Sequence, residues 1–297
     1  MYIPLTPRRR SGFTLIELLI VIAIIVILVA LLLSGIFYAY SRMKEAGAVS
    51  EVKQLDAALQ AFKGKYGVYP LSRIRLCSNY AQYSLSPTPN ANGGVALDQA
   101  SISFINRMWP NIGAWSNINW AGNGSNVDEI LEGDQCLVFF LGGIPTPSNN
   151  SFTFNGFSVN PKDPSAVNSN AGIVPPFYAF PFDRVYLRNG NNFPSFSDYY
   201  ARTNPAPTPY IFFSAYNRRN GYAPSFAQPI LGVSPYFTSN GQYLNPDTCQ
   251  IICAGANGNY GAGGQWTPQT ADTIYPAGSA GSDDLTNFYP SQMGVVQ

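Results

Sequence analysis

Few residues of this chain could carry out chemistry, because histidine is absent from all 297 positions. Its absence excludes histidine-based triads and histidine metal ligands, and leaves carboxylate, lysine, tyrosine or cysteine chemistry. Acidic residues cluster only at Asp128-Glu129, at Glu132 with Asp134, and at Asp283-Asp284. The first four fall at the start of a helix that we predict over 128–141, where the helix dipole favours negative charge. We therefore interpret them as structural, and predict no catalytic residue and no enzyme.

One further carboxylate stands where it is costly. Glu17 follows Phe13-Thr14-Leu15-Ile16 and precedes an unbroken apolar run from Leu18 to Leu33. A charge in hydrocarbon costs about 2.5–3.5 kcal/mol on insertion scales. The segment 13–33 reaches ~32 Å as a helix and matches a hydrocarbon core of about 30 Å. It is therefore expected to cross a membrane once. The charge of Glu17 within this segment then requires an explanation.

The residues that flank this segment indicate its orientation in the membrane, and two ordinary interpretations of the segment can be compared with them. Arg8, Arg9 and Arg10 precede it, whereas only Arg42 and Lys44 follow closely, so residues 1–12 are expected in the cytoplasm. A secretory signal peptide would have a shorter apolar region and a small-residue cleavage site, and neither is seen. An ordinary uncleaved anchor fits the length and the flanks but leaves Glu17 unexplained.

The residues Gly12-Phe13-Thr14-Leu15-Ile16-Glu17 resemble the processing motif of the type IV pilin superfamily, which includes the pseudopilins of type II secretion. The resemblance implies that a prepilin peptidase cuts between Gly12 and Phe13, removes the leader 1–12 and methylates the new amino group of Phe13. It also implies that Glu17 pairs with the amino terminus of a neighbouring subunit. A carboxylate too costly to leave alone in lipid becomes tolerable when a partner charge is delivered to it.

This resemblance implies a structural subunit of a type II secretion pseudopilus or a related type IV filament. The implied partners are like subunits and minor pseudopilins, the prepilin peptidase, the inner-membrane assembly platform and membrane lipid. The chain would cross the bacterial inner membrane once, with a cytoplasmic N-terminus and a periplasmic domain. The alternative is a membrane-tethered extracytoplasmic domain that binds or catalyses and uses the helix only as an anchor. Only the pilin hypothesis requires loss of residues 1–12.

Composition gives no indication of a nucleic-acid partner. Removal of the leader takes three of the 17 Lys and Arg and none of the 16 Asp and Glu, which leaves 14 against 16, or −2. A nucleic-acid-binding surface would need a basic balance. The glycine-rich stretch 255–264 lacks a Lys-Ser/Thr ending and a following helix pattern, so it is poor evidence for a phosphate site.

The helix is predicted to continue beyond the membrane. A three-and-four spacing places one apolar stripe on a single face, made of Met43, Ala46, Val49, Val52, Leu55, Leu59, Phe62 and Tyr66. Gly64, Gly67 and Pro70 then end the helix, which would run ~80 Å from Phe13 to about Lys65, within the segment 13–67. We expect the stripe to pack on the protein's own sheet. Phe62, Gly67, Tyr69 and Pro70 resemble the helix exit of many pseudopilins.

Residues 68–297 are expected to form one extracytoplasmic domain. Helices are predicted over 98–109 and over 128–141, the second capped by Asn126 and ended by Gly142-Gly143. Strands are predicted at 152–154 with 157–159, and at 184–187, 210–216 and 248–254. Their short separations favour antiparallel pairing. The predicted class is α+β: a long N-terminal transmembrane and amphipathic helix packed on an antiparallel β-sheet, a pilin-like fold with a large loop-rich insertion within 71–246.

The segments 247–261 and 283–288 resemble the last strand and closing loop of the major, G-type pseudopilins, many of which hold calcium there. Asn257 stands where many of them carry an acidic residue. Carboxylate and amide oxygens are calcium ligands, so Asn257, Asp283 and Asp284 form a candidate structural Ca²⁺ site. The alternative is that the two aspartates only solvate a surface loop.

The four cysteines, Cys77, Cys136, Cys249 and Cys253, would lie in a compartment that permits disulfides. Cys249 and Cys253 share a face of the predicted strand 248–254, ~13 Å apart, which is too far for a bridge to one another. Two disulfides and four buried free thiols both remain open, since buried cysteine often packs as a small hydrophobe.

Overall fold

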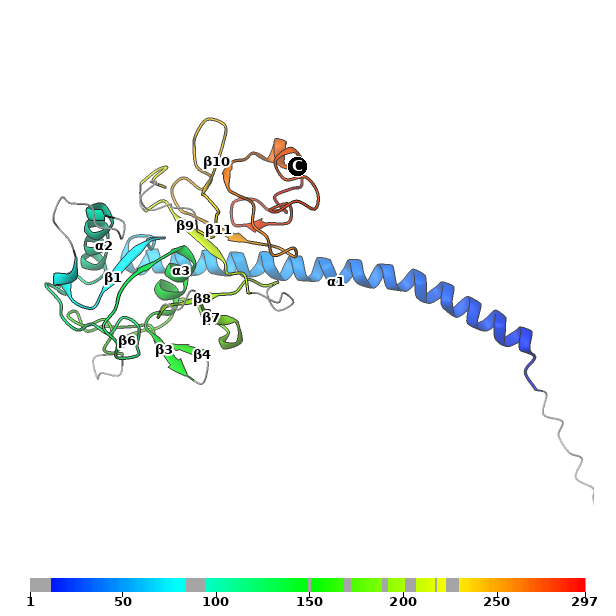
Figure 1. Cartoon of the computed structure of the whole chain (residues 1–297), viewed down its shortest axis with the longest axis horizontal. Helices are drawn as coiled ribbons and strands as arrows, with labels where there is room; N and C mark the ends of the chain where they lie inside the picture. The colour runs from blue at the N-terminus through cyan, green and yellow to red at the C-terminus, as the bar shows by residue number, and fades with distance from the viewer. Residues whose placement is uncertain are drawn as a thin grey trace, which may run out of the picture. The chain divides into compact units, whose positions relative to one another are not determined.

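The computed structural model describes residues 12–83, 94–148, 151–167, 172–188, 192–200, 207–216, 218–222 and 230–296 (Figure 1). The chain divides into two units, Met1–Ala46 and Gly47–Gln297. The arginines of the expected leader lie outside the described residues.

One helix, α1 (Leu15–Tyr66), runs through both units and confirms the long helix predicted from the sequence. Its segment in the first unit exposes every large apolar side chain from Leu15 to Met43. By length and composition α1 is the one helix among the described residues that could cross a membrane. An apolar helix that is exposed all round fits lipid rather than water as its surroundings.

In the second unit α1 is a core helix. It buries Ala48, Val52, Leu55, Ala58, Leu59 and Phe62. The predicted stripe is therefore right from Val49 onward and wrong at its start, because Met43 is 61% exposed and Ala46 is exposed too. Both residues belong to the first unit, in which the described residues 12–46 include no buried apolar side chain.

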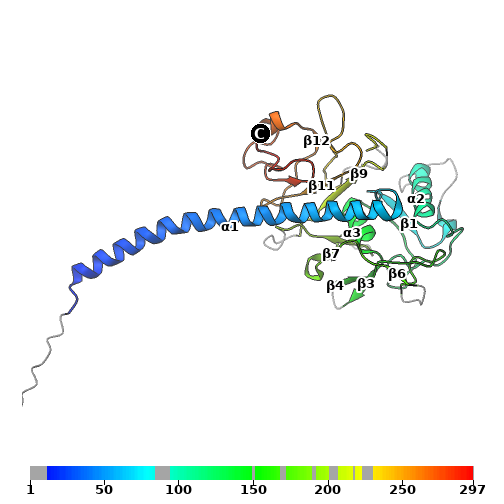
Figure 2. The ribbon, with the colours of Figure 1, turned by 180° about the vertical axis from the view of Figure 1, so that it is seen from behind.

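The central sheet has the order β13–β11–β9 and is antiparallel throughout, as predicted. Its strands are β9 (Ile211–Ser214), β11 (Cys249–Cys253) and β13 (Leu285–Thr286). Figures 1 and 2 show β9 and β11 beside the second half of α1. Side chains alternate between the two faces: Phe212 and Ile251 join the core that contains α1, whereas Phe213 and Ile252 join a second apolar cluster.

The remaining strands of the described residues form two-stranded pairs. These are β1 (Ile74–Cys77) with β2 (Asp128–Leu131), β3 (Pro145–Ser148) with β4 (Ser151–Phe154), β5 (Phe157–Ser158) with β6 (Ile173–Val174), β7 (Val185–Leu187) with β8 (Pro194–Phe196), and the parallel pair β10 (Tyr236–Phe237) and β12 (Gly264–Gln265). The predicted strands at 152–154, 157–159 and 184–187 are confirmed as β4, β5 and β7, while the first residue of the last, Arg184, ends the 3-10 turn η2 (Phe182–Arg184).

The helix predicted over 98–109 is confirmed as α2 (Gly94–Met108). The helix predicted over 128–141 is wrong in its first part: Asp128–Leu131 is strand β2, and α3 (Gly133–Gly142) begins after Glu132, not after Asn126. Tertiary pairing overrides the local pattern here, because all four residues of β2 find partners along β1. Two short 3-10 turns, η1 (Tyr80–Gln82) and η4 (Pro268–Thr270), and the one-turn helix α4 (Ala271–Ile274) complete the elements.

Gly133 is required by a close approach of two backbones. A Cβ added there would lie 1.9 Å from the carbonyl oxygen of Phe212 on β9. No side chain fits in that space, so the glycine lets α3 begin directly against the central sheet. At the other end Gly143 has φ +87°, which ends α3 as predicted.

Candidate functional site

The start of α1 holds the Glu17 carboxylate in a capping arrangement with Thr14. Glu17 Oε2 accepts hydrogen bonds from the Thr14 backbone N–H and from the Thr14 hydroxyl, both at 2.8 Å. In return the Glu17 N–H donates to Thr14 Oγ1 at 3.2 Å. This reciprocal pair satisfies donors that a helix start otherwise leaves unpaired. Glu17 is therefore tied to its own helix end in the single chain.

The sites predicted from the sequence did not include Thr14, although the sequence contains a signal for its capping role. A Thr followed three residues later by Glu before an apolar run is a capping-box pattern. The Glu17 carboxylate is also open to another donor, because the described residues leave this end of the helix exposed. The geometry can therefore hold a carboxylate ready for a cationic group such as an amino terminus.

Gly12 lies in the open immediately before this cap. A Cβ added at Gly12 would meet no atom within 4 Å, and its φ is not in the left-handed region. The fold therefore gives no reason for a glycine here. The requirement for glycine that the processing motif implies would therefore come from the peptidase that binds this segment.

The closing loop holds the other predicted site residues, of which Asp283 is half-buried, Asp284 is buried and Asn257 is exposed. Asp283 Oδ2 accepts a hydrogen bond from the Asn257 N–H, and Asp284 Oδ2 accepts one from the Gly261 N–H, both at 2.9 Å. Asp284 is 0% exposed, so it does not simply solvate a surface loop. Burial raises the pKa of Asp283 and raises that of Asp284 to about 8.

The second oxygen of each aspartate, Oδ1, is buried and has no hydrogen-bond partner. Buried carboxylate oxygens without donors are costly and fit a cation. Asn257 fits less well, because its Oδ1 accepts the Asn259 N–H at 2.6 Å. Within the described ranges no group of three or more His, Cys, Asp or Glu could hold a metal ion. A cation here would take Asp283 and Asp284, with the remaining oxygens from elsewhere.

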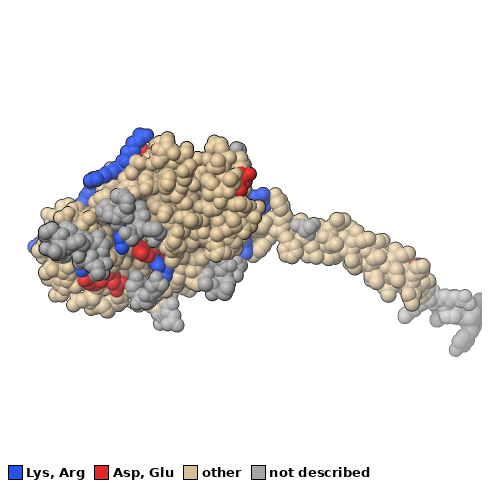
Figure 3. Space-filling view, turned by 45° about the horizontal axis from the view of Figure 1, so that its top comes forward, with Lys and Arg blue, Asp and Glu red and all other residues tan. Residues whose placement is uncertain are grey.

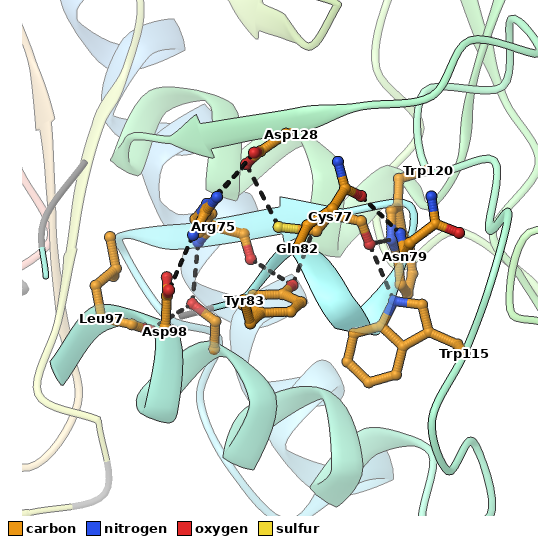
Figure 4. A network of polar contacts seen from close by, with 11 residues as sticks. Arg75, Cys77, Asn79, Gln82, Tyr83, Leu97, Asp98, Trp115, Trp120 and Asp128 are labelled. Atoms are coloured by element: carbon orange, nitrogen blue, oxygen red, sulfur yellow. Dashed lines mark hydrogen bonds and ion pairs between the residues drawn. The ribbon is translucent and has the colours of Figure 1, made fainter. Parts of the chain in front are cut away.

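The other acidic clusters have partners of their own in the second unit. Arg75 on β1 binds Asp128 through two nitrogens at 2.7 Å, and Asp98 of α2 at 2.9 Å (Figure 4). Arg188 binds Glu132 at 2.6 Å and the buried Asp134 at 2.8 Å. Asp128 and Glu129 thus lie on a strand and not at a helix start, which corrects the dipole argument for these two residues.

Cys77 lies in the same network as Arg75. Its backbone carbonyl accepts hydrogen bonds from the indole N–H groups of Trp115 and Trp120, each at 3.0 Å, as Figure 4 shows. All four cysteines are free and buried. Burial raises the pKa of the Cys77 thiol to about 12 and the pKa of the other three thiols as well. Of the two alternatives left open, the structure has the free thiols.

Charged side chains do not gather into a binding surface on the face shown in Figure 3. Most of that face carries neither Lys, Arg, Asp nor Glu, although a short band of basic side chains lies along its upper edge. That short band does not extend across the face, as binding along a nucleic-acid backbone would require.

Comparisons with known proteins agree with the N-terminal motif. The family model for the prokaryotic N-terminal methylation motif matches residues 7–33. The type II secretion system core protein G of Aeromonas hydrophila is 31% identical over 84 residues. That match covers 28% of this chain and 59% of the relative, so the chain spans less than two thirds of the relative's length. No solved structure matches significantly. The resemblance to the type IV pilins and pseudopilins, predicted from Gly12 to Glu17, is thereby confirmed.

Proposed function

We propose that this pilin-like chain is a structural subunit of a type II secretion pseudopilus or of a related type IV filament. The observation that carries the proposal is the methylation motif over 7–33, followed by an apolar helix that is exposed all round. The similarity to the core protein G supports the secretion branch. The chain acts by assembly rather than catalysis, and its partners are other subunits, the prepilin peptidase, the assembly platform and membrane lipid.

In the proposed pathway the subunit first crosses the inner membrane, with residues 1–12 in the cytoplasm and the second unit in the periplasm. The peptidase then removes the leader and methylates the amino group of Phe13. The freed terminus is cationic, and the Glu17 carboxylate of a neighbouring subunit can pair with it. Because an ion pair in lipid costs far less than a lone charge, this pairing favours the packed filament.

We also propose that the closing loop binds calcium, a structural role on which the proposed function does not depend. Calcium bound by Asp283 and Asp284 would supply positive charge to the two unpartnered Oδ1 atoms. These residues would hold the loop between β11 and β13 closed when the ion is present.

Processing tests the proposal directly. The chain is expressed in cells with an active prepilin peptidase, extracted from membranes and analysed by mass spectrometry of its terminus. We expect the wild type to begin at N-methylated Phe13 and Gly12→Leu to keep its leader. Gly35→Leu is the matched control, because a side chain at either glycine has open space. A wild-type chain that still begins at Met1 would overturn the proposal.

A further inference from the structure

Two tyrosine–cation pairs lie on α1 just beyond its apolar run. The Arg42 guanidinium lies 5.3 Å from the Tyr38 ring centre, and its Nε donates to the Tyr38 hydroxyl at 3.2 Å. The Lys44 Nζ lies 4.7 Å from the Tyr40 ring centre. Both pairs have four-residue spacing, so each ring and its cation lie on one side of the helix. The tyrosine side chains are 64% and 51% exposed, so the described part of the unit does not bury them.

The placement of the pairs around the helix indicates what surrounds them. At 3.6 residues per turn, Tyr38 and Tyr40 point about 200° apart. A protein partner would cover one side of a helix, whereas a lipid headgroup layer surrounds it. Tyrosine rings favour the membrane interface, and Arg and Lys beside them match phospholipid phosphates in charge.

We propose that Tyr38, Tyr40, Arg42 and Lys44 form an interfacial anchor that sets the depth of the unassembled subunit in the membrane, with the phosphate layer of the periplasmic leaflet as its ligand. The anchor rests on the membrane crossing of the proposed function but not on filament assembly. It moves the hydrocarbon-embedded segment from 13–33 to 18–37, which is 20 uncharged residues and ~30 Å of helix.

This depth changes the surroundings that are expected for Glu17. With residues 18–37 in hydrocarbon, Glu17 and its Thr14 cap lie in the cytoplasmic headgroup region and not inside the core. The cost of about 2.5–3.5 kcal/mol for a charge in hydrocarbon is then avoided before assembly. Glu17 would enter a low-dielectric environment only when a neighbouring subunit brings its amino terminus.

Cysteine accessibility tests the anchor in the full chain. Single substitutions Val26→Cys, Gly35→Cys, Ser41→Cys and Ser50→Cys are treated, in spheroplasts without assembly machinery, with a membrane-impermeant maleimide. We expect labelling at 41 and 50 and protection at 26 and 35. The unsubstituted chain gives the background, which should be low because its four cysteines are buried. An added side chain at Gly35 meets no atom within 4 Å.

Each other outcome identifies what fails. Labelling at 35 equal to that at 41 would overturn the anchor and restore the 13–33 depth. Protection at 41 would place the boundary further along α1 and would also overturn it. Labelling at 26 would show that the helix does not cross the membrane, and so would contradict the proposed function itself.

A second variant tests whether the four side chains set the boundary. The combined change Tyr38→Leu, Tyr40→Leu, Arg42→Ala and Lys44→Ala lengthens the apolar run, so the helix can slide toward the cytoplasm. We expect labelling of the Ser41→Cys chain to fall at least threefold. Lys53→Ala with Lys65→Ala removes the same charge from exposed positions on α1 and should change nothing. Unchanged labelling in the fourfold variant would overturn the proposal.

Discussion

Glu51 of α1 and Arg184 of η2 form a bidentate ion pair inside the protein, with Nη1–Oε1 and Nη2–Oε2 distances of 2.7 Å. The two residues are 8% and 5% exposed. The Tyr210 hydroxyl also donates to Glu51 at 2.5 Å, and the Ser197 carbonyl accepts from Arg184 at 2.6 Å. The pair thus joins the helix to residues 133 positions later in the chain.

Removal of Glu51 should strongly destabilise the second unit. Glu51→Ala leaves the Arg184 guanidinium buried without its counter-charge, and breaking a buried pair in this way costs about 3–5 kcal/mol. Lys53→Ala is the control, because Lys53 lies two residues further along α1 and is exposed. It should change stability by less than about 0.5 kcal/mol. Urea unfolding of the full chain in detergent, followed by tryptophan fluorescence, measures both. All four tryptophans lie in the second unit, so they report on it alone. Equal stability of the two variants would contradict this account.

Arg75 should make stability depend on acid pH. Hydrogen bonds from Arg75 hold the pKa of Asp128 below its usual value of 3.8. Such a depressed pKa contributes stability above pH 3.8 that is lost as the pH falls through the folded-state pKa. Arg75→Met removes this contribution and also leaves Asp98, 1% exposed, without its cation. We expect a lower free energy of unfolding than wild type at pH 7 and a smaller difference near pH 3.

Arg107→Met is the control for that measurement, because Arg107 lies exposed on the same helix as Asp98. It should leave the pH dependence of the wild type intact. Parallel curves for wild type and Arg75→Met from pH 7 to pH 3 would show that the Arg75–Asp128 pair does not supply the acid-dependent stability.

Glu17→Val should separate membrane insertion from assembly. Without the carboxylate the helix should insert at least as well as wild type, yet the variant should form no filaments as the sole copy, because the neighbour's amino terminus loses its counter-charge. Thr14→Ala removes the internal donor hydroxyl and keeps the carboxylate, so it should still assemble. Electron microscopy of sheared material, with membrane fractionation alongside, checks both. A normal filament yield from Glu17→Val would refute the pairing.

Calcium should raise the melting midpoint of the second unit. Binding to the folded state alone adds RT ln(1 + [L]/Kd), about 2.7 kcal/mol at a hundredfold excess over Kd. Asp283→Ala should abolish the effect, and Asp272→Ala, at an exposed position outside the loop's carboxylate pair, should not. Melting with millimolar calcium and then with chelator makes the comparison. An unchanged midpoint in both conditions would leave the loop as packing only.

The elements that could be predicted from the sequence are those whose signal is local. The apolar run after Glu17 and the three-and-four stripe through Phe62 determine α1, since each residue's surroundings repeat with the helical period. β9 and β11 are readable because they are short apolar segments bounded by turn residues. The motif from Gly12 to Glu17 is contiguous and so needs no fold to be recognised.

Only the tertiary structure decided the features that depend on distant partners. Strand β2 was predicted as helix because its pairing partners on β1 lie far away in the sequence, as Leu76 and Glu129 show. The Glu51–Arg184 pair and the free state of the four thiols are likewise set by which segments meet in space. The position of a charged residue or a cysteine in the sequence does not indicate which residue it will contact in the fold. Folding brings the partner near by closing the chain between the two residues. Burial then makes the partner necessary, because a buried charge without a counter-charge is strongly destabilising.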